Sequence, residues 1–234
     1  RITDTNNCTS NATINISQPA APLSLQYLST DVLCYGNNSG AINLSVFGGS
    51  APYNYVWSNN TGNQDLNNII AGTYSVSVTD AAGCVANTTV NITQPAAPLN
   101  PTFVLTNVLC YGQSTGAIDL SVSGGVPNYT YAWSNGTSGQ DISGVTNGFY
   151  AVSITDANGC VATASSLITQ PAQVVNVIPS IVDVLCNGQS NGAINTTITG
   201  GVPSYQLLWS NGQTTPNISN LSAGNYSLQV TDFN

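Results

Sequence analysis

The sequence predicts an all-β protein built from a tandem repeat of 76 residues. Three segments, 31–49, 107–125 and 183–201, align at that spacing without an insertion or a deletion. Within each repeat, apolar and polar residues alternate with the period of two that is typical of half-buried strands. Clusters of Gly, Asn, Ser and Pro separate these runs and indicate turns. No segment has the apolar spacing of an amphipathic helix, so we expect strands throughout.

The first repeat predicts the order of its strands. The expected ranges are 23–34, 41–48, 53–58, a short strand followed by another within 63–70, then 73–80 and 84–93. Ile42 and Leu44 share one face of the second strand, because side chains alternate across a sheet. The last range is rich in β-branched residues, which favour strands. Short strands at regular spacing in a unit of this size predict a β-sandwich.

Two aromatic positions make the predicted sandwich immunoglobulin-like. A Trp lies in the middle of the third strand, where these sandwiches place a core Trp, and a Tyr follows Gly at the start of 73–80, as in a tyrosine corner. We therefore predict tandem immunoglobulin-like sandwiches, similar to PKD and fibronectin type III domains, in a head-to-tail rod. The predicted core residues are Trp57, Trp133, Trp209, Tyr74, Tyr150 and Tyr226.

The repeat register divides the chain into four predicted parts. Residues 1–19 are expected to be the C-terminal strand of a preceding repeat, 20–95 and 96–171 are the first and second sandwiches, and 172–234 is a third sandwich that is truncated before its last strand. The stray strand, Cys8–Ser17, can complete the sandwich of a neighbouring subunit by strand donation.

Composition excludes several classes of function. The 234 residues carry a net charge of −8, with Arg1 as the single basic residue and no His. Without His or Lys, no Ser–His or Ser–Lys nucleophile can form. An acidic chain repels nucleic acid, and no apolar run is long enough to cross a bilayer. We therefore expect no enzyme, no nucleic-acid partner and no membrane insertion by this segment.

A Thr-Asp pair recurs at Asp4, Asp80, Asp156 and Asp232. One interpretation is a turn in which the carboxylate accepts backbone N–H groups. The other is a calcium ligand, for which Asp80 and Asp156 are the weak candidates. Because Ca²⁺ takes six to eight oxygens and the other acids are scattered, the turn is the preferred interpretation. No cofactor is predicted, and structural calcium is the one alternative.

Six cysteines alternate at spacings of 26 and 50 residues. We expect disulfides, because exported proteins favour them. The structural bonds are expected at Cys34, Cys84, Cys110 and Cys160, with Cys34 paired either to Cys84 in its own repeat or to Cys160 in the next. The sequence leaves these two pairings open. For Cys8 and Cys186, partners outside the chain are expected.

The motifs of residues 124–160 resemble the SprB-type repeat of surface proteins from gliding Bacteroidetes. The shared pattern is Gly-Gly, Pro-x-Tyr, Tyr-x-Trp-Ser-Asn-Gly, Gly-x-Tyr and Thr-Asp, although the third repeat has Leu207 in place of Tyr55 and Tyr131. The resemblance implies a secreted cell-surface protein, such as a mobile adhesin or filament exported by the type IX route.

Three functions are consistent with these features. The preferred one is an extracellular structural array, the stalk or filament of a bacterial adhesin, whose partners are neighbouring repeats of the same chain or filament. The alternatives are a module that binds glycans or surfaces through avidity and a subunit of a strand-donated filament. The Tyr-x-Tyr-x-Trp stripe is one candidate platform for glycan binding. Its three aromatic side chains share one face of a central strand, which predicts that they belong to the hydrophobic core.

Overall fold

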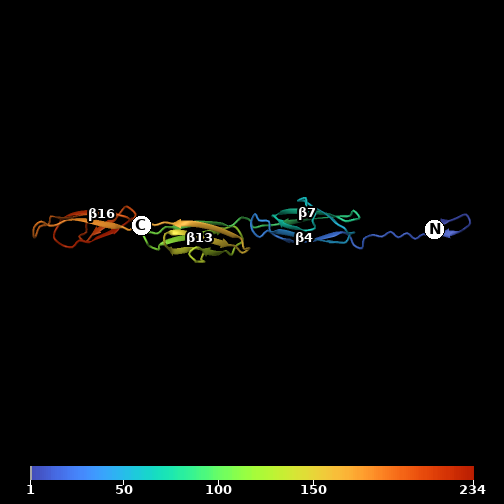
Figure 1. The fold of residues 1–234 in the computed structure, drawn as a ribbon, viewed down its shortest axis with the longest axis horizontal. Coiled ribbons are helices and arrows are strands. Elements are labelled where there is room, and N and C mark those ends of the chain that lie inside the picture. The colour runs from blue at the N-terminus through green and yellow to red at the C-terminus, as the bar shows by residue number, and fades with distance from the viewer. Residues whose placement is uncertain (1) are drawn as a thin grey trace. The chain divides into compact units, whose positions relative to one another are not determined.

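The computed structural model describes residues 2–234, so Arg1 lies outside it. Every regular element in this range is a β-strand, and no helix there is long and apolar enough to cross a membrane. The chain divides into two compact units, one that ends at Pro98 and one formed by Leu99–Asn234. Figure 1 labels strands from each unit. The predicted all-β class is confirmed.

The first sandwich has two three-stranded antiparallel sheets. The first sheet has the order β3-β4-β6, with β3 at Ser24–Thr30, β4 at Gly40–Phe47 and β6 at Leu66–Ile69. The second has the order β5-β7-β8, with β5 at Asn54–Trp57, β7 at Gly72–Thr79 and β8 at Val85–Ile92. This is the arrangement of strands A-B-E against C-F-G in immunoglobulin-like domains.

The second sandwich repeats this topology. Its first sheet, β9-β10-β12, consists of Asn100–Thr106, Gly116–Ser123 and Ile142–Val145. Its second sheet, β11-β13-β14, consists of Thr130–Trp133, Gly148–Thr155 and Val161–Ile168. The short strand predicted to follow 53–58, ahead of the strand now seen as β6, does not form in the first sandwich, and its equivalent does not form in the second.

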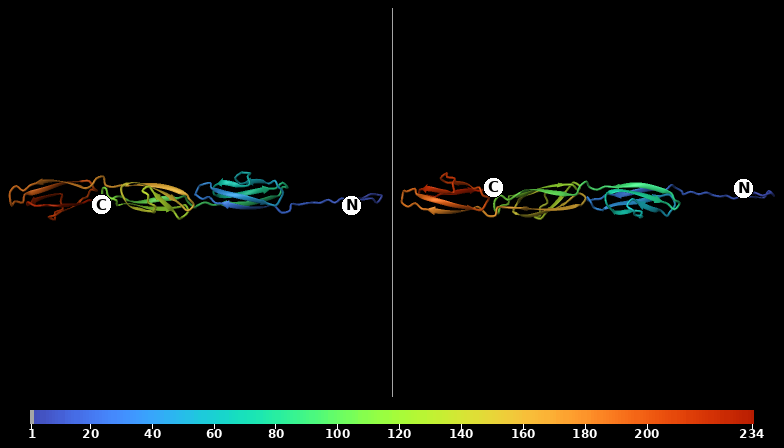
Figure 2. Two further views of the ribbon diagram at one scale, coloured as in Figure 1. Left: turned by 60° about the horizontal axis from the view of Figure 1, so that its bottom comes forward. Right: turned by 90° about the horizontal axis from the view of Figure 1, so that it is seen from above.

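The third sandwich keeps only part of this arrangement. The sheet β15-β16-β18 is complete, with strands Asn176–Val182, Gly192–Thr199 and Asn217–Leu221. Among the described residues, the other sheet has two strands, β17 at Gln206–Trp209 and β19 at Leu228–Thr231. The two further views in Figure 2 show the paired layers of each sandwich.

The N-terminal segment differs from its expected structure. The two-residue strands β1 (Ile2–Thr3) and β2 (Thr9–Ser10) pair as a hairpin, but the strand predicted over Cys8–Ser17 forms only at Thr9–Ser10. All side chains from Ile2 to Pro22 are exposed. A lone strand that has no sheet to extend leaves its backbone groups to water, so the rest of this range stays irregular.

The inner faces of the two sheets form the core of each sandwich. Leu44 and Leu120, equivalent positions at the 76-residue spacing, have no exposed surface. The three tryptophans are buried, and Tyr150 is buried as well. Tyr74 and Tyr226 are half-buried, because their rings pack on the core while their hydroxyl groups lie at the rim.

Candidate functional site

Each complete sandwich holds a buried aspartate at the turn between its last two strands. Asp80 follows β7, and its Oδ1 accepts the backbone N–H groups of Ala82 at 3.0 Å and Cys84 at 2.8 Å. Its Oδ2 accepts the N–H of Ser50 at 2.9 Å, from the loop that follows β4. One carboxylate therefore shapes its own turn and ties that turn to the opposite sheet.

Equivalent residues in the next repeats make the same contacts. Asp156 accepts the N–H groups of Asn158, Cys160 and Val126 at 2.8–2.9 Å, and Asp232 accepts that of Val202 at 2.9 Å. Asp4 accepts two turn amides. These are the hydrogen bonds expected for the turn interpretation, and the link to the opposite sheet is an addition that the sequence did not predict.

Backbone amides lower the pKa values of the Asp80 and Asp156 carboxyls. The N–H of Ser50 is the main cause that lowers the pKa of Asp80, and the turn amides add to it against the opposing effect of burial. For Asp156, burial acts to raise the pKa, but the amides of Val126, Cys160, Asn158 and Gly159 together lower it. Both side chains are 5% exposed. Ionised carboxylates in this setting are stabilised by several donors at once.

This geometry uses the carboxylate oxygens that the calcium hypothesis needed. Three N–H groups donate to Asp80, and several, those of Val126, Asn158 and Cys160 among them, donate to Asp156. Within residues 2–234, no group of three or more His, Cys, Asp or Glu side chains has the placement to hold a metal ion. The geometry therefore supports a structural role for Asp80 and Asp156.

A Gly-Gly pair before the third strand recurs in each repeat and makes room for the aspartate. Gly49 has a φ of +65°, and a Cβ at this position would lie 2.7 Å from Oδ2 of Asp80. Gly125 has the same relation to Asp156, also at 2.7 Å. Only glycine combines this backbone conformation with this close approach.

The aromatic positions complete the internal framework. The hydroxyl of Tyr74 donates to the carbonyl of Ile70 at 3.0 Å, and Tyr150 and Tyr226 donate to Thr146 and Ser222. The predicted tyrosine corner is therefore present in all three repeats. Each Trp indole donates to a loop carbonyl six residues ahead at 2.9 Å, so these rings are fixed structural parts.

Sequence reasoning missed a Tyr–Gln pair. The hydroxyl of Tyr55 donates to Gln64 at 3.2 Å, and that of Tyr131 donates to Gln140 at 3.3 Å. In the third repeat both members change together, to Leu207 and Pro216. This joint change is the signal in the sequence from which the pair could have been found. It assigns Tyr55 and Tyr131 a local structural partner.

The cysteines correct part of the sequence prediction. Cys34 and Cys160 are disulfide-bonded, whereas Cys84 and Cys110 are exposed free thiols, as are Cys8 and Cys186. The bond from Cys34 to Cys84 is therefore not formed. β8 (Val85–Ile92) separates Cys84 from Thr93, and the N–H of Thr93 donates to the carboxylate of Asp31, three residues before Cys34. A strand of this length spans ~25 Å, while a disulfide needs Cα atoms within ~7 Å.

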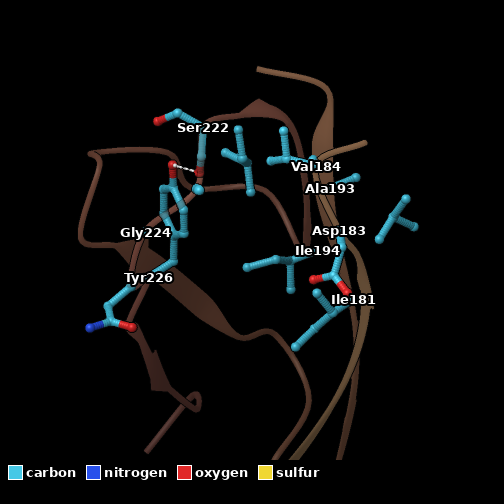
Figure 3. A pocket seen from close by; sticks show the side chains of 13 residues that line it. Ile181, Asp183, Val184, Ala193, Ile194, Ser222, Gly224 and Tyr226 are labelled. Atoms are coloured by element: carbon cyan, nitrogen blue, oxygen red, sulfur yellow. Dashed lines mark hydrogen bonds between the residues drawn. The ribbon is translucent and has the colours of Figure 1, made fainter. Parts of the chain in front are cut away.

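The third sandwich contains a groove of about 490 Å³ (Figure 3). Ile181, Asp183, Val184 and Ile194 line one side, and the segment from Leu221 to Tyr226 lines the other. A second hollow of about 380 Å³ lies next to it over residues 184–189. Both occur where the first two sandwiches place their last strand.

The fold and its internal contacts define a class: a tandem array of immunoglobulin-like β-sandwiches. The family model described as SprB repeat matches residues 28–62, 102–138 and 178–214. These three matches confirm the resemblance to the SprB-type repeat that the sequence predicted. No curated protein matches the chain.

Several solved structures with more than one domain are similar to this chain. The N-terminal eight Ig domains of Down Syndrome Cell Adhesion Molecule share 11% identity over 81% of this chain and 36% of that one, with a TM-score of 0.35. Domains 4–9 of surface layer protein SbsC share 14% sequence identity over 92% of this chain and 44% of that one, with a TM-score of 0.29. Drosophila OTK extracellular domains 3–5 share 13% sequence identity over 93% of this chain and 95% of that one, with a TM-score of 0.26. The chain spans about a third of the length of the first of these structures.

Proposed function

We propose that this chain is an extracellular structural array that forms the stalk or filament of a bacterial cell-surface adhesin, without catalytic activity. One observation carries the proposal: each repeat rebuilds the same internal framework. The buried aspartate, the tyrosine corner and the Trp contact recur. The same framework at a fixed period is what a load-bearing array requires.

The disulfide-bonded cysteines support a covalent link between neighbouring repeats. We propose that Cys34 pairs with Cys160, 126 positions later, because both are bonded and Cys84 and Cys110 are free. At the 76-residue spacing, each cysteine before the second strand of a repeat then pairs with the one that follows the Thr-Asp turn of the next repeat. Such a link limits how far an array extends under load.

Force spectroscopy on the full chain, held at both ends, tests the stalk proposal. We expect separate unfolding events for the sandwiches, and an added contour length of ~430 Å when a reductant opens a bond across 126 residues. Reduction that adds only ~170 Å would indicate a bond across 50 residues and contradict the Cys34–Cys160 pairing. Extension of the oxidised chain at negligible force would contradict the load-bearing function.

The glycan-binding alternative needs an outward-facing patch that the repeats share. The exposed positions of the third strand hold Asn54 and Val56 in the first repeat, Thr130 and Ala132 in the second. Gln206 and Leu208 occupy them in the third. One of the two positions is uncharged and polar in every repeat, the other is aliphatic, and neither holds an aromatic ring on which a sugar could stack. This strand therefore does not favour glycan binding. Retention of the chain on a glycan array would reverse that judgement.

A further inference from the structure

In the proposed array, tension enters each repeat at its first strand and leaves it after its last strand. In the first sandwich these strands are β3 and β8, which are edge strands of different sheets and lie next to each other. The connecting segments reach β3 at Ser24 and leave β8 at Ile92. The contacts that hold β3 to β8 therefore lie between the two points at which force is applied.

Three hydrogen bonds join the C-terminal ends of these two strands. The N–H of Val32 donates to the carbonyl of Thr93 at 2.9 Å. The N–H of Thr93 donates to Oδ1 of Asp31 at 2.7 Å and lowers the pKa of that carboxyl, so the bond is charge-assisted at neutral pH. The N–H of Gly36, in the loop after β3, donates to Oε1 of Gln94 at 2.8 Å. We call these three bonds the strand clasp.

The second sandwich rebuilds the strand clasp at the same positions of its repeat. The N–H of Val108 donates to the carbonyl of Thr169 at 2.9 Å, and the N–H of Thr169 donates to Oδ1 of Asn107 at 2.9 Å. The N–H of Gly112 donates to Oε1 of Gln170 at 2.9 Å. Because Asn107 replaces an aspartate and still accepts the bond, the repeats share the hydrogen bond rather than the charge.

Apolar packing supports the strand clasp from the core side. Val32 and Ile92 are each 2% exposed and belong to the same core. A Cβ on Gly40 would lie 2.9 Å from Cγ2 of Ile92, so the end of β8 packs closely against β4. Buried side chains beside the bond between Val32 and Thr93 limit the access of water, which would otherwise compete for a stretched hydrogen bond.

The direction of the strands determines how tension acts on the clasp. Because the C-terminal ends of β3 and β8 meet there, the two neighbouring strands run in the same direction. Tension pulls β3 toward its N-terminus and β8 toward its C-terminus, so it slides the strands past each other and stretches the three bonds together. We propose that rupture of the strand clasp sets the force at which each repeat unfolds. This inference rests on the proposed function as a stalk or filament and names the residues that resist tension.

Force spectroscopy of the full chain in reductant, where no disulfide limits extension, tests the proposal. Each complete sandwich should unfold in one event that adds up to ~260 Å of contour length. The variant Asp31→Ala/Gln94→Ala removes two clasp bonds from the first sandwich alone. One of the two events should move to lower force, with an unfolding rate at a given load that rises by at least roughly tenfold. The event of the second sandwich should stay unchanged and serves as an internal control.

The first sandwich also offers a matched control variant, Gln64→Ala/Asp65→Ala. The carboxylate of Asp65 accepts the N–H of Leu44 at 2.9 Å, and the amide of Gln64 donates to the carbonyl of Leu44. These bonds hold the segment before β6 to β4 and do not join the first strand to the last. The control should lower Tm but leave the unfolding force unchanged, because bonds that are still intact when the clasp ruptures do not affect the unfolding rate.

The outcomes separate this inference from the proposed function. An unchanged unfolding force in the clasp variant, or an equal fall in force in the clasp and control variants, would overturn the proposal and leave the stalk function standing. A wild type that extends at negligible force would contradict both. The single variant Gln94→Ala, at a half-buried position, should give the same shift to a smaller degree and keeps the test decisive if a double variant does not fold.

Discussion

At the scale of single residues, the buried aspartate explains the recurring Thr-Asp pair. An acid beside a thiol suggests chemistry when it is read alone. In the structure, the Asp80 carboxylate accepts amides from two loops, and Gly49 leaves the space for it. A buried carboxylate is stable only with such partners, so its recurrence reflects a structural requirement of every repeat.

Replacement of this carboxylate should destabilise a sandwich. Asp156→Asn removes the negative charge and turns an N–H donor toward backbone donors, which leaves amides without an acceptor. We expect a fall in Tm of several degrees for the full chain in differential scanning calorimetry. Asp119→Asn removes the same charge at an exposed position and should leave Tm unchanged. Equal Tm values for both variants would contradict the role of Asp156.

Acid should destabilise the protein through the same groups. The folded pKa values of Asp80 and Asp156 lie below the ordinary value, so their stabilisation is present above about pH 4, the unfolded range, and is lost as pH falls through the folded pKa. Thermal melts from pH 7 to 2 should show a constant Tm that then declines. Asp156→Asn should flatten this decline, and an unchanged slope in that variant would exclude its titration as a cause.

At the scale of elements, the last strand decides whether a sandwich is closed. The periodic pattern located the strands to within a few residues, because alternation and turn residues are local signals. The periodic pattern did not show that residues 11–17 form no regular structure. That segment has the same pattern as β8 and β14, but strand structure requires a paired neighbour.

The effect of this strand can be measured at two equivalent positions. Ile168 has no exposed surface, whereas Ile16 is 93% exposed. Ile168→Ala should lower the free energy of unfolding of its sandwich by about 2–5 kcal/mol, through lost burial and a cavity. Ile16→Ala should change it by less than ~0.5 kcal/mol at concentrations where the chain is monomeric. Urea denaturation followed by Trp fluorescence measures both, and similar losses would contradict the exposed state of Ile16.

At the scale of the whole molecule, the chain gains stability with almost no ion pairs. Only 4% of its residues are charged, and the frameworks are built from backbone hydrogen bonds and apolar cores. This composition also has a consequence for proteolysis, because the only basic side chain is Arg1.

Trypsin should leave the chain essentially intact even after unfolding. Cleavage is confined to the bond after Arg1, so gels of heated, reduced samples should show one band of unchanged mobility. Chymotrypsin, which cuts after aromatic residues, serves as the control and should degrade the same unfolded sample. Tryptic fragments of the purified chain would contradict the prediction.

The sequence by itself determined the repeat, the strands, the sandwich class and the tyrosine corner, because each depends on local patterns that recur at a fixed spacing. The tertiary structure decided which backbone groups Asp80 and Asp156 bind and why Cys84 cannot reach Cys34. It also decided that Val184 and Ile194 border an open groove. These features depend on which distant segments meet across a sandwich, and pairwise distances of that kind follow from strand order and packing rather than from the pattern along the chain.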